Sequence, residues 1–136
     1  MPNNHKHLVV LTIDDHASQR ARIAELLEGP TVRVIEAAGV DDALAVIDQD
    51  EPQVITLDIV FDDDRESDGY RFCARLKERL PNVPIIAVSS RGRGVDKNLM
   101  QTRGAADYIP KSELSRERLR ESVLAVLPSA ATHLPA

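Results

Sequence analysis

Apolar runs alternate with amphipathic segments along the chain. The runs are short and rich in valine, isoleucine and leucine, as is typical of buried strands. Between them, apolar residues recur at helical spacing, with charged residues on the opposite side. We expect strands over residues 8–13, 31–37, 53–59, 84–88 and 106–109.

The amphipathic segments predict the helices. The first carries Ile23, Leu26 and Leu27 on one side and ends at Gly29-Pro30, a pair that stops helices. An acidic loop is expected over residues 62–68, before the third helix. We expect the other helices from Asp41-Asp42 onwards, from after Gly69 to Leu80, over a weakly patterned segment at 96–103, and over 116–127.

This alternation predicts an α/β fold. Five strands that alternate with five helices favour a doubly wound parallel sheet with helices on both faces. At this chain length we expect the flavodoxin-like strand order 2-1-3-4-5, whose ligands lie beyond the carboxyl ends of the strands. We expect the domain to span residues 8–127, with an N-terminal tail at 1–7 and a flexible tail at 128–136.

Composition narrows the classes of function. The 136-residue chain has only 3% aromatic residues and no tryptophan, which disfavours a protein that stacks bases on aromatic rings. Its net charge of -5 argues against direct binding of nucleic acid, which requires neutralised phosphates. One cysteine excludes an internal disulfide, and no apolar run has the length of a signal peptide or a membrane span. We therefore expect a cytoplasmic protein with no membrane insertion.

Polar residues stand at each predicted strand end that borders the expected ligand site. Asp14 and Asp15 follow the first strand, Asp58 ends the third, Ser89 follows the fourth and Lys111 follows the fifth. Three carboxylates in one crevice repel one another, and carboxylate oxygens with room for water suit Mg²⁺. A carboxylate can also attack phosphorus, while a hydroxyl and an ammonium stabilise the transferred group. Each residue alone has a plainer explanation, as a helix cap, a turn acid, a loop serine or a surface lysine, so the prediction depends on their joint placement.

As a set, these residues resemble the receiver domain of two-component response regulators, of the chemotaxis-regulator type. The resemblance covers about residues 8–127 and includes the segment Gly104–Ile109 and the spacing between Ser89 and Lys111. It implies a phosphorylation-dependent switch in which Asp58 accepts a phosphoryl group from a histidine kinase or histidine phosphotransfer protein. The switch would signal through contacts with an unidentified downstream protein. No enzymatic activity is implied beyond transfer to Asp58 and hydrolysis from it.

The resemblance implies a role for each metal-site residue. Asp15 would bind Mg²⁺ directly and Asp14 largely through water, and Asp58 and the backbone carbonyl of Val60 would complete the protein ligands.

It also implies a group of residues that respond to phosphorylation. Ser89 and Lys111 would each contact a phosphoryl oxygen. Tyr108 matches the family's switch aromatic, which turns inward when Ser89 moves; its plainer role is that of a half-buried strand tyrosine.

Two features depart from the family's pattern. No proline follows Val60-Phe61, and residues 62–67 lengthen the acidic loop before Asp68-Gly69. The added acids could raise cation affinity, repel an acidic partner or simply face solvent. Lys111 is followed by Ser112, where the family usually has proline and often a cis peptide. A non-proline cis bond costs about 2.5–4 kcal/mol, so we expect a trans bond.

Other functions fit the residues less well. A receiver cut from a longer regulator or hybrid kinase is the alternative to a single-domain response regulator. A small aspartyl-phosphate phosphohydrolase usually carries Asp-x-Asp after its first strand, a spacing that Asp14-Asp15-His16 breaks. A flavin-binding electron carrier needs a phosphate-binding loop where the two acids stand. A degenerate receiver used only for docking would not need the complete set.

Overall fold

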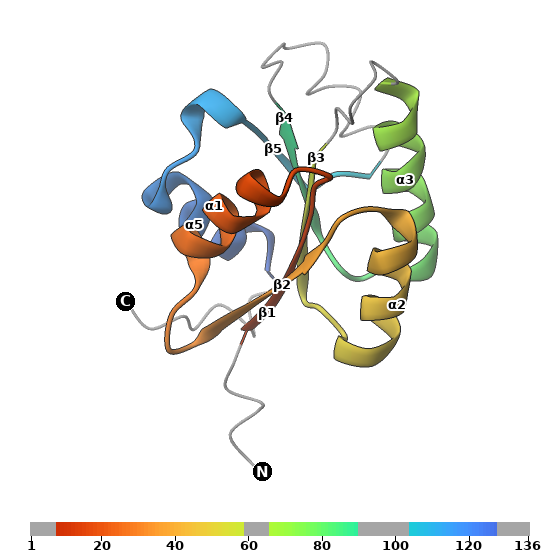
Figure 1. Cartoon of the computed structure of the whole chain (residues 1–136), viewed down its shortest axis with the longest axis horizontal. Helices are drawn as coiled ribbons and strands as arrows, with labels where there is room; N and C mark the ends of the chain where they lie inside the picture. The colour runs from red at the N-terminus through yellow and green to blue at the C-terminus, as the bar shows by residue number, and fades with distance from the viewer. Residues whose placement is uncertain (1–7, 59–65, 90–103, 128–136) are drawn as a thin grey trace.

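The computed structural model describes residues 8–58, 66–89 and 104–127, with all their side chains except those of residues 40 and 66–71. Figure 1 shows one central sheet with helices on both faces. All its strand pairs are parallel and the order is β2-β1-β3-β4-β5, which confirms the predicted doubly wound fold. The strands are β1 (Leu8–Ile13), β2 (Val32–Ala37), β3 (Val54–Asp58), β4 (Ile85–Ser89) and β5 (Asp107–Pro110).

The described helices divide between the two faces of the sheet. In Figure 1, α1 and α5 cover one face while α2 and α3 cover the other. None of these helices combines the length and hydrophobicity that a bilayer span requires. Their bounds are α1 (Ala17–Leu27), α2 (Val40–Asp50), α3 (Glu66–Arg79) and α5 (Arg116–Val126), with the 3₁₀ turn η2 at Lys111–Glu113.

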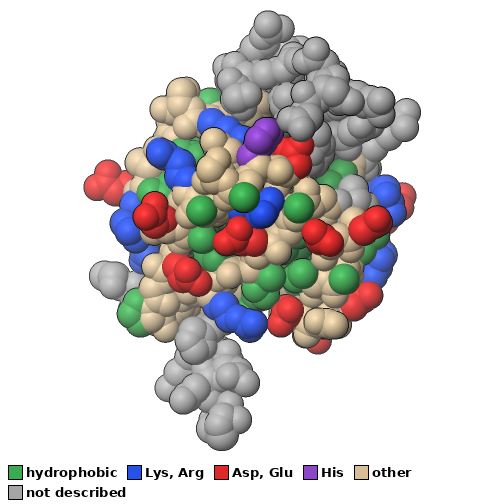
Figure 2. Space-filling view, viewed as in Figure 1, with side chains coloured by type: hydrophobic (Ala, Val, Ile, Leu, Met, Phe, Trp, Pro, Cys, Tyr) green, Lys and Arg blue, Asp and Glu red, His purple; other side chains and the backbone are tan. Residues whose placement is uncertain are grey.

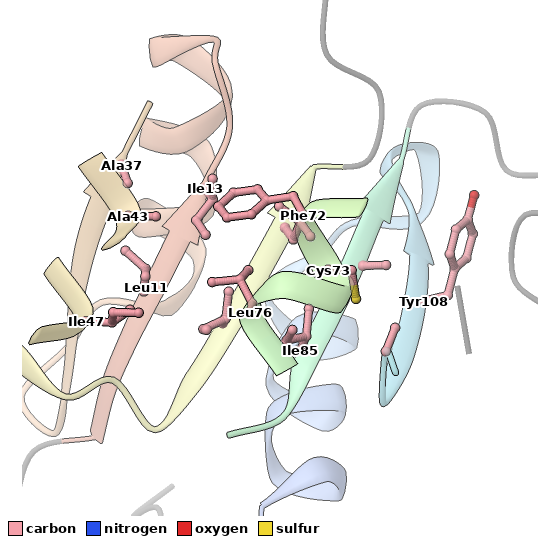
Figure 3. Close-up of a cluster of buried hydrophobic side chains, with 14 residues drawn as sticks. Leu11, Ile13, Ala37, Ala43, Ile47, Phe72, Cys73, Leu76, Ile85 and Tyr108 are labelled. Carbon is pink, nitrogen blue, oxygen red and sulfur yellow. The ribbon is translucent and has the colours of Figure 1, made fainter. Parts of the chain in front are cut away.

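Alternate side chains of the strands enter two separate apolar layers. On β1, Val10 belongs to the layer that includes residues of α1 and α5, whereas Leu11 belongs to the layer that includes residues of α2 and α3. Figure 3 shows the second layer, in which Leu76 of α3 and Ile47 of α2 lie against the sheet. Because both faces of the sheet are buried, the strands read as nearly continuous apolar runs.

The parallel register brings the carboxyl ends of the central strands to one edge of the sheet. Ile13 pairs with Leu57, Asp58 with Val88, and Ser89 with Pro110. A residue that ends one of these strands therefore lies close to the residues that end its neighbours.

The predicted strand bounds agree with the structure to within one residue at the described ends. The start of α3 is the main error: the helix begins at Glu66, so the predicted loop at 62–68 is wrong for its last three residues. Gly69 lies inside this helix. A glycine destabilises a helix interior by only about 1 kcal/mol, and this cost is too small to end the helix here. The predicted helix at 96–103 and both predicted tails lie outside the described residues. No sequence pattern predicts η2, because its single turn is too short to show periodicity.

Candidate functional site

The acidic residues identified from the sequence gather at the carboxyl edge of the sheet. Asp14 directly follows β1, and its N–H donates to the carbonyl of Ala37 at the end of β2 (3.1 Å). Asp58 is the last residue of β3. The side chains of Asp14 and Asp58 are 6% and 3% exposed, and that of Asp15 is 24% exposed. Two buried carboxylates and one half-buried carboxylate thus share this edge.

Among the described residues, Lys111 supplies the positive charge nearest to the two buried carboxylates. Its Nζ donates a hydrogen bond to Asp14 Oδ2 at 3.1 Å and lies 3.4 Å from Asp58 Oδ1. Lys111 follows β5, so an ammonium from the far edge of the sheet reaches acids on two central strands. One lysine cannot neutralise three carboxylates, which leaves the site with excess negative charge.

Asp58 lies in an environment that disfavours its ionised form. Burial raises its pKa to about 6, with a further contribution from the Asp14 carboxylate, although Lys111 acts in the opposite direction. Among the described residues, neither oxygen of Asp58 accepts a hydrogen bond. Buried polar atoms are normally hydrogen-bonded. The carboxylate is therefore placed to meet a cation or a reacting group.

The donor set fits a divalent cation. Asp14, Asp15, His16 and Asp58 each offer one ligand atom, and these atoms all lie within 4.8 Å of one another. Three of the four are carboxylates, which are the ligands that Mg²⁺ prefers, and Mg²⁺ can retain several waters beside them. The residues present therefore suit the Mg²⁺ expected from the sequence.

His16 is a neighbour that sequence reasoning missed. Its Nδ1 lies 3.0 Å from Asp15 Oδ1 and 3.5 Å from Asp14 Oδ1. The purple side chain in Figure 2 is the one histidine of the described residues, and it lies at the surface beside acidic side chains. The sequence signal for this neighbour is its position directly after the acidic pair Asp14-Asp15.

Arg20 is a second contact that the sequence did not reveal. Its Nη1 donates to the backbone carbonyl of Asp14 at 2.7 Å, and its Nε donates to Glu36 Oε1 of β2 at 3.1 Å. The guanidinium therefore connects α1 to the turn after β1 and to the edge strand. This arrangement fixes the backbone from which the acidic pair projects.

Of the remaining expected site residues, Ser89 and Tyr108 are described by the structure and Val60 is not. Ser89 is buried at the end of β4, on the strand next to Asp58. Val60 lies outside the described residues. Tyr108 is 4% exposed rather than half-buried, and its hydroxyl makes no hydrogen bond to the described residues. Figure 3 shows it at the edge of the apolar layer of α2 and α3.

The backbone after Lys111 is regular. The structure has no cis peptide among its described residues, so the expected trans bond between Lys111 and Ser112 is confirmed. The chain turns through η2 at this point.

Asp107, one residue before Tyr108, is an acid with a structural role. Burial alone would raise its pKa, but hydrogen bonds from the Ser122 hydroxyl and the Tyr108 amide, with the charge of Arg118, lower it overall. Asp107 thus has hydrogen-bond donors that stabilise its ionised form, whereas Asp58 accepts no hydrogen bond from the described residues.

Comparisons of the sequence with known proteins find one protein family and relatives that match most of this chain. The sequence model of one protein family, the response regulator receiver domain, matches residues 10–124. Protein PilG of Pseudomonas aeruginosa is 33% identical over 124 residues, which cover 90% of this chain and 89% of PilG. Protein PilH of the same organism is 27% identical over 120 residues, which cover 87% of this chain and 96% of PilH.

A solved structure supports the same fold assignment. NtrX from Brucella abortus, in complex with ADP, matches with a TM-score of 0.81 and 27% identity over 91% of this chain. The match spans only 28% of the NtrX chain.

Proposed function

Because this chain belongs to the response regulator receiver domain family, we propose that it is a phosphorylation-dependent signalling switch with Asp58 as its phosphoacceptor. The phosphodonor is a histidine kinase or a histidine phosphotransfer protein, and the output is a contact with a downstream protein. The proposed setting is the cytoplasm. The proposal concerns the receiver itself and applies equally to a receiver within a longer chain, since the match to NtrX spans only part of that protein.

One observation carries the proposal: a buried carboxylate whose oxygens accept no well-formed hydrogen bond from the described residues lies beside an ammonium. Asp58 is 3% exposed and has Lys111 Nζ at 3.4 Å. Its pKa of about 6, raised by burial and then by Asp14, still leaves most molecules ionised at neutral pH. The group is therefore available as a nucleophile and is poorly stabilised before reaction.

The proposed reaction is a direct transfer between two nucleophiles. An oxygen of Asp58 attacks the phosphorus of a phosphohistidine, and a P–O bond forms as the P–N bond breaks. The electron pair of the broken bond returns to the imidazole of the donor, so the products are an acyl phosphate and a free histidine. Lys111 stabilises the negative charge on the transferred oxygens, and Asp14 and Asp15 would hold the cation. When bound, Mg²⁺ supplies the positive charge that the excess of carboxylates lacks.

Three further assignments follow from the family pattern. We assign Ser89 to a second phosphoryl oxygen and the carbonyl of Val60 to the cation. We assign Tyr108 to the response, in which its side chain changes environment after Asp58 gains charge. The burial of Ser89 beside β3 and of Tyr108 near the same sheet edge supports the first and third assignments.

The test is incubation of the purified chain with acetyl phosphate and Mg²⁺, followed by intact-mass measurement. The unaltered chain should gain about 80 Da, the mass of one phosphoryl group. Asp58→Asn should gain nothing, and Lys111→Ala should form the adduct more slowly or respond less to it.

A matched control uses an acid away from the site. Asp41 is exposed in the first turn of α2, so Asp41→Asn should accept the phosphoryl group as the unaltered chain does. An adduct that persists in Asp58→Asn would show that another residue is the nucleophile.

A further inference from the structure

The imidazole of His16 lies within the coordination range of the carboxylate site. Its Nδ1 is 3.0 Å from Asp15 Oδ1 and 3.5 Å from Asp14 Oδ1. Two donors that are neighbours on one first-row metal ion are about 3 Å apart, because each bond is about 2.0–2.2 Å long. The nitrogen therefore occupies the position of an adjacent ligand rather than that of a remote charge.

The backbone holds this histidine at the mouth of the site. The His16 N–H donates to Asp14 Oδ1 at 2.9 Å. The His16 carbonyl accepts from the amides of Gln19 (3.0 Å) and Arg20 (3.1 Å) as α1 begins. The side chain itself is 51% exposed, so the ring can adjust toward an ion without displacing any core residue.

A separate observation indicates that a cation, and not only an ion pair at the surface, belongs here. Asp58 comes from a different strand and is 3% exposed, yet neither of its oxygens accepts a hydrogen bond from the described residues. Its ligand atom nevertheless lies within 4.8 Å of those of His16, Asp14 and Asp15. A shared ion would satisfy this buried acid, and the imidazole nitrogen would be one of the donors around it.

The chemistry of the fourth donor determines which metal ions the site binds more tightly. Imidazole nitrogen suits transition metals, whose affinities rise from Mn²⁺ through Co²⁺ to Ni²⁺, whereas Mg²⁺ favours oxygen ligands. We propose that His16 is a fourth donor to the cation site and shifts its preference from Mg²⁺ toward transition metals. This inference rests on the proposed function, since it concerns the same cation site.

The test compares metal binding with and without the imidazole. The chain has three other histidines, His5, His7 and His133, which could bind Ni²⁺ by themselves. The parent for the test is therefore the full chain with H5Q, H7Q and H133Q, in which His16 is the only histidine. Calorimetric titration with Ni²⁺ and with Mg²⁺ is then repeated after His16→Gln, and circular dichroism verifies the fold.

The expected result is a loss of Ni²⁺ affinity with little change in Mg²⁺ affinity. Ni²⁺ affinity should fall about tenfold or more in His16→Gln, while Mg²⁺ affinity should change less than about twofold. Pulsed electron paramagnetic resonance of the Mn²⁺-loaded parent should detect a nitrogen nucleus coupled to the metal, and His16→Gln should abolish this coupling.

Two outcomes would overturn the inference in different ways. If Mg²⁺ binds and His16→Gln leaves Ni²⁺ affinity unchanged, or changes both affinities equally, His16 is only an ion-pair partner of Asp15 and the proposed function survives. If no divalent cation binds the unaltered chain, the inference and the metal dependence of the proposed function fail together.

Discussion

At the scale of single residues, two acids of this domain have opposite electrostatic environments. Asp58 has its pKa raised to about 6 by burial and by Asp14, so its ionised form is destabilised in the folded chain. Asp107 has a lowered pKa, because hydrogen bonds from Ser122 and Tyr108 and the charge of Arg118 outweigh its burial. The first acid costs stability at neutral pH and the second contributes to it.

Asp58→Asn should therefore stabilise the metal-free protein in a pH-dependent way. Between about pH 4 and pH 6 the folded chain binds more protons than the unfolded chain, so its stability falls as pH rises through this range. The variant lacks this loss, and its advantage in unfolding free energy should grow from near zero below pH 4 to at most about 3 kcal/mol above pH 6.5. Urea unfolding in EDTA across this range measures the difference; an advantage that does not vary with pH would contradict the explanation.

Asp107→Asn is the companion variant with the opposite sign. Because the folded pKa is lowered, the ionised acid stabilises the protein above its unfolded pKa of about 4. The variant should be less stable than the unaltered chain at pH 7, and the gap should close as the pH falls through the lowered pKa. The same urea series measures both variants.

At the scale of secondary-structure elements, each central strand changes from apolar to polar along its length. On β1, Val10 is followed two positions later by Thr12 and then by Asp14; on β3, Thr56 is followed by Asp58. Thr56 Oγ1 donates to Thr12 Oγ1 at 2.6 Å, and both threonines are 1% exposed. The pair joins β1 and β3 one step below the acids.

Removal of both hydroxyls from this pair should cost less than the sum of the two single removals. Thr56→Val leaves the buried Thr12 hydroxyl without its partner and should lower the unfolding free energy by about 1–3 kcal/mol. In the double variant T12V/T56V no orphaned hydroxyl remains, so the loss should be smaller than the sum of the two single losses. Chemical denaturation of the four proteins measures the coupling, and additive losses would show that the bond contributes little.

Among the helices and strands, the strand ends can be predicted from the sequence, but the start of α3 cannot. The strand ends were located because each apolar run stops sharply at a charged or polar residue such as Asp14 or Asp58. The predicted start of α3 is wrong because Gly69 disfavours a helix interior by about 1 kcal/mol, a cost that the rest of the helix outweighs. Local propensity fails where the neighbouring turns of a helix decide the conformation.

The site was predicted to the extent that topology alone determines it. Asp14, Asp58 and Lys111 follow from one rule, that parallel strands end at a common edge. His16 and Arg20 could not be predicted, because their contacts depend on side-chain direction within the first turn of α1. The contact of Arg20 with Glu36 joins two elements whose relative position no sequence pattern specifies.

At the scale of the whole molecule, a cation at the carboxyl edge would connect the separate central strands. Any ligand that binds only the folded chain stabilises it by an amount that depends on its concentration. At ten times its dissociation constant, Mg²⁺ should add about 1.4 kcal/mol to the unfolding free energy. Thermal unfolding should show this as a rise in Tm of about 3–6 °C for a chain of this size.

The proper control for this measurement separates binding from screening of charge. Asp15→Asn should abolish most of the rise in Tm, because it removes a half-exposed donor without disturbing the core. Potassium chloride at equal ionic strength should have a much smaller effect. An equal rise with both salts would mean that Mg²⁺ acts on the general surface charge and not at this edge.

The contact between Lys111 and Asp14 joins residues 97 positions apart in the chain. During synthesis the acids are made before the ammonium that balances them, because Lys111 follows the last of the five strands. Until Lys111 is made, the nascent domain carries these acids without that ammonium. A fragment that stops before Lys111 would therefore lack the ammonium that faces both buried carboxylates.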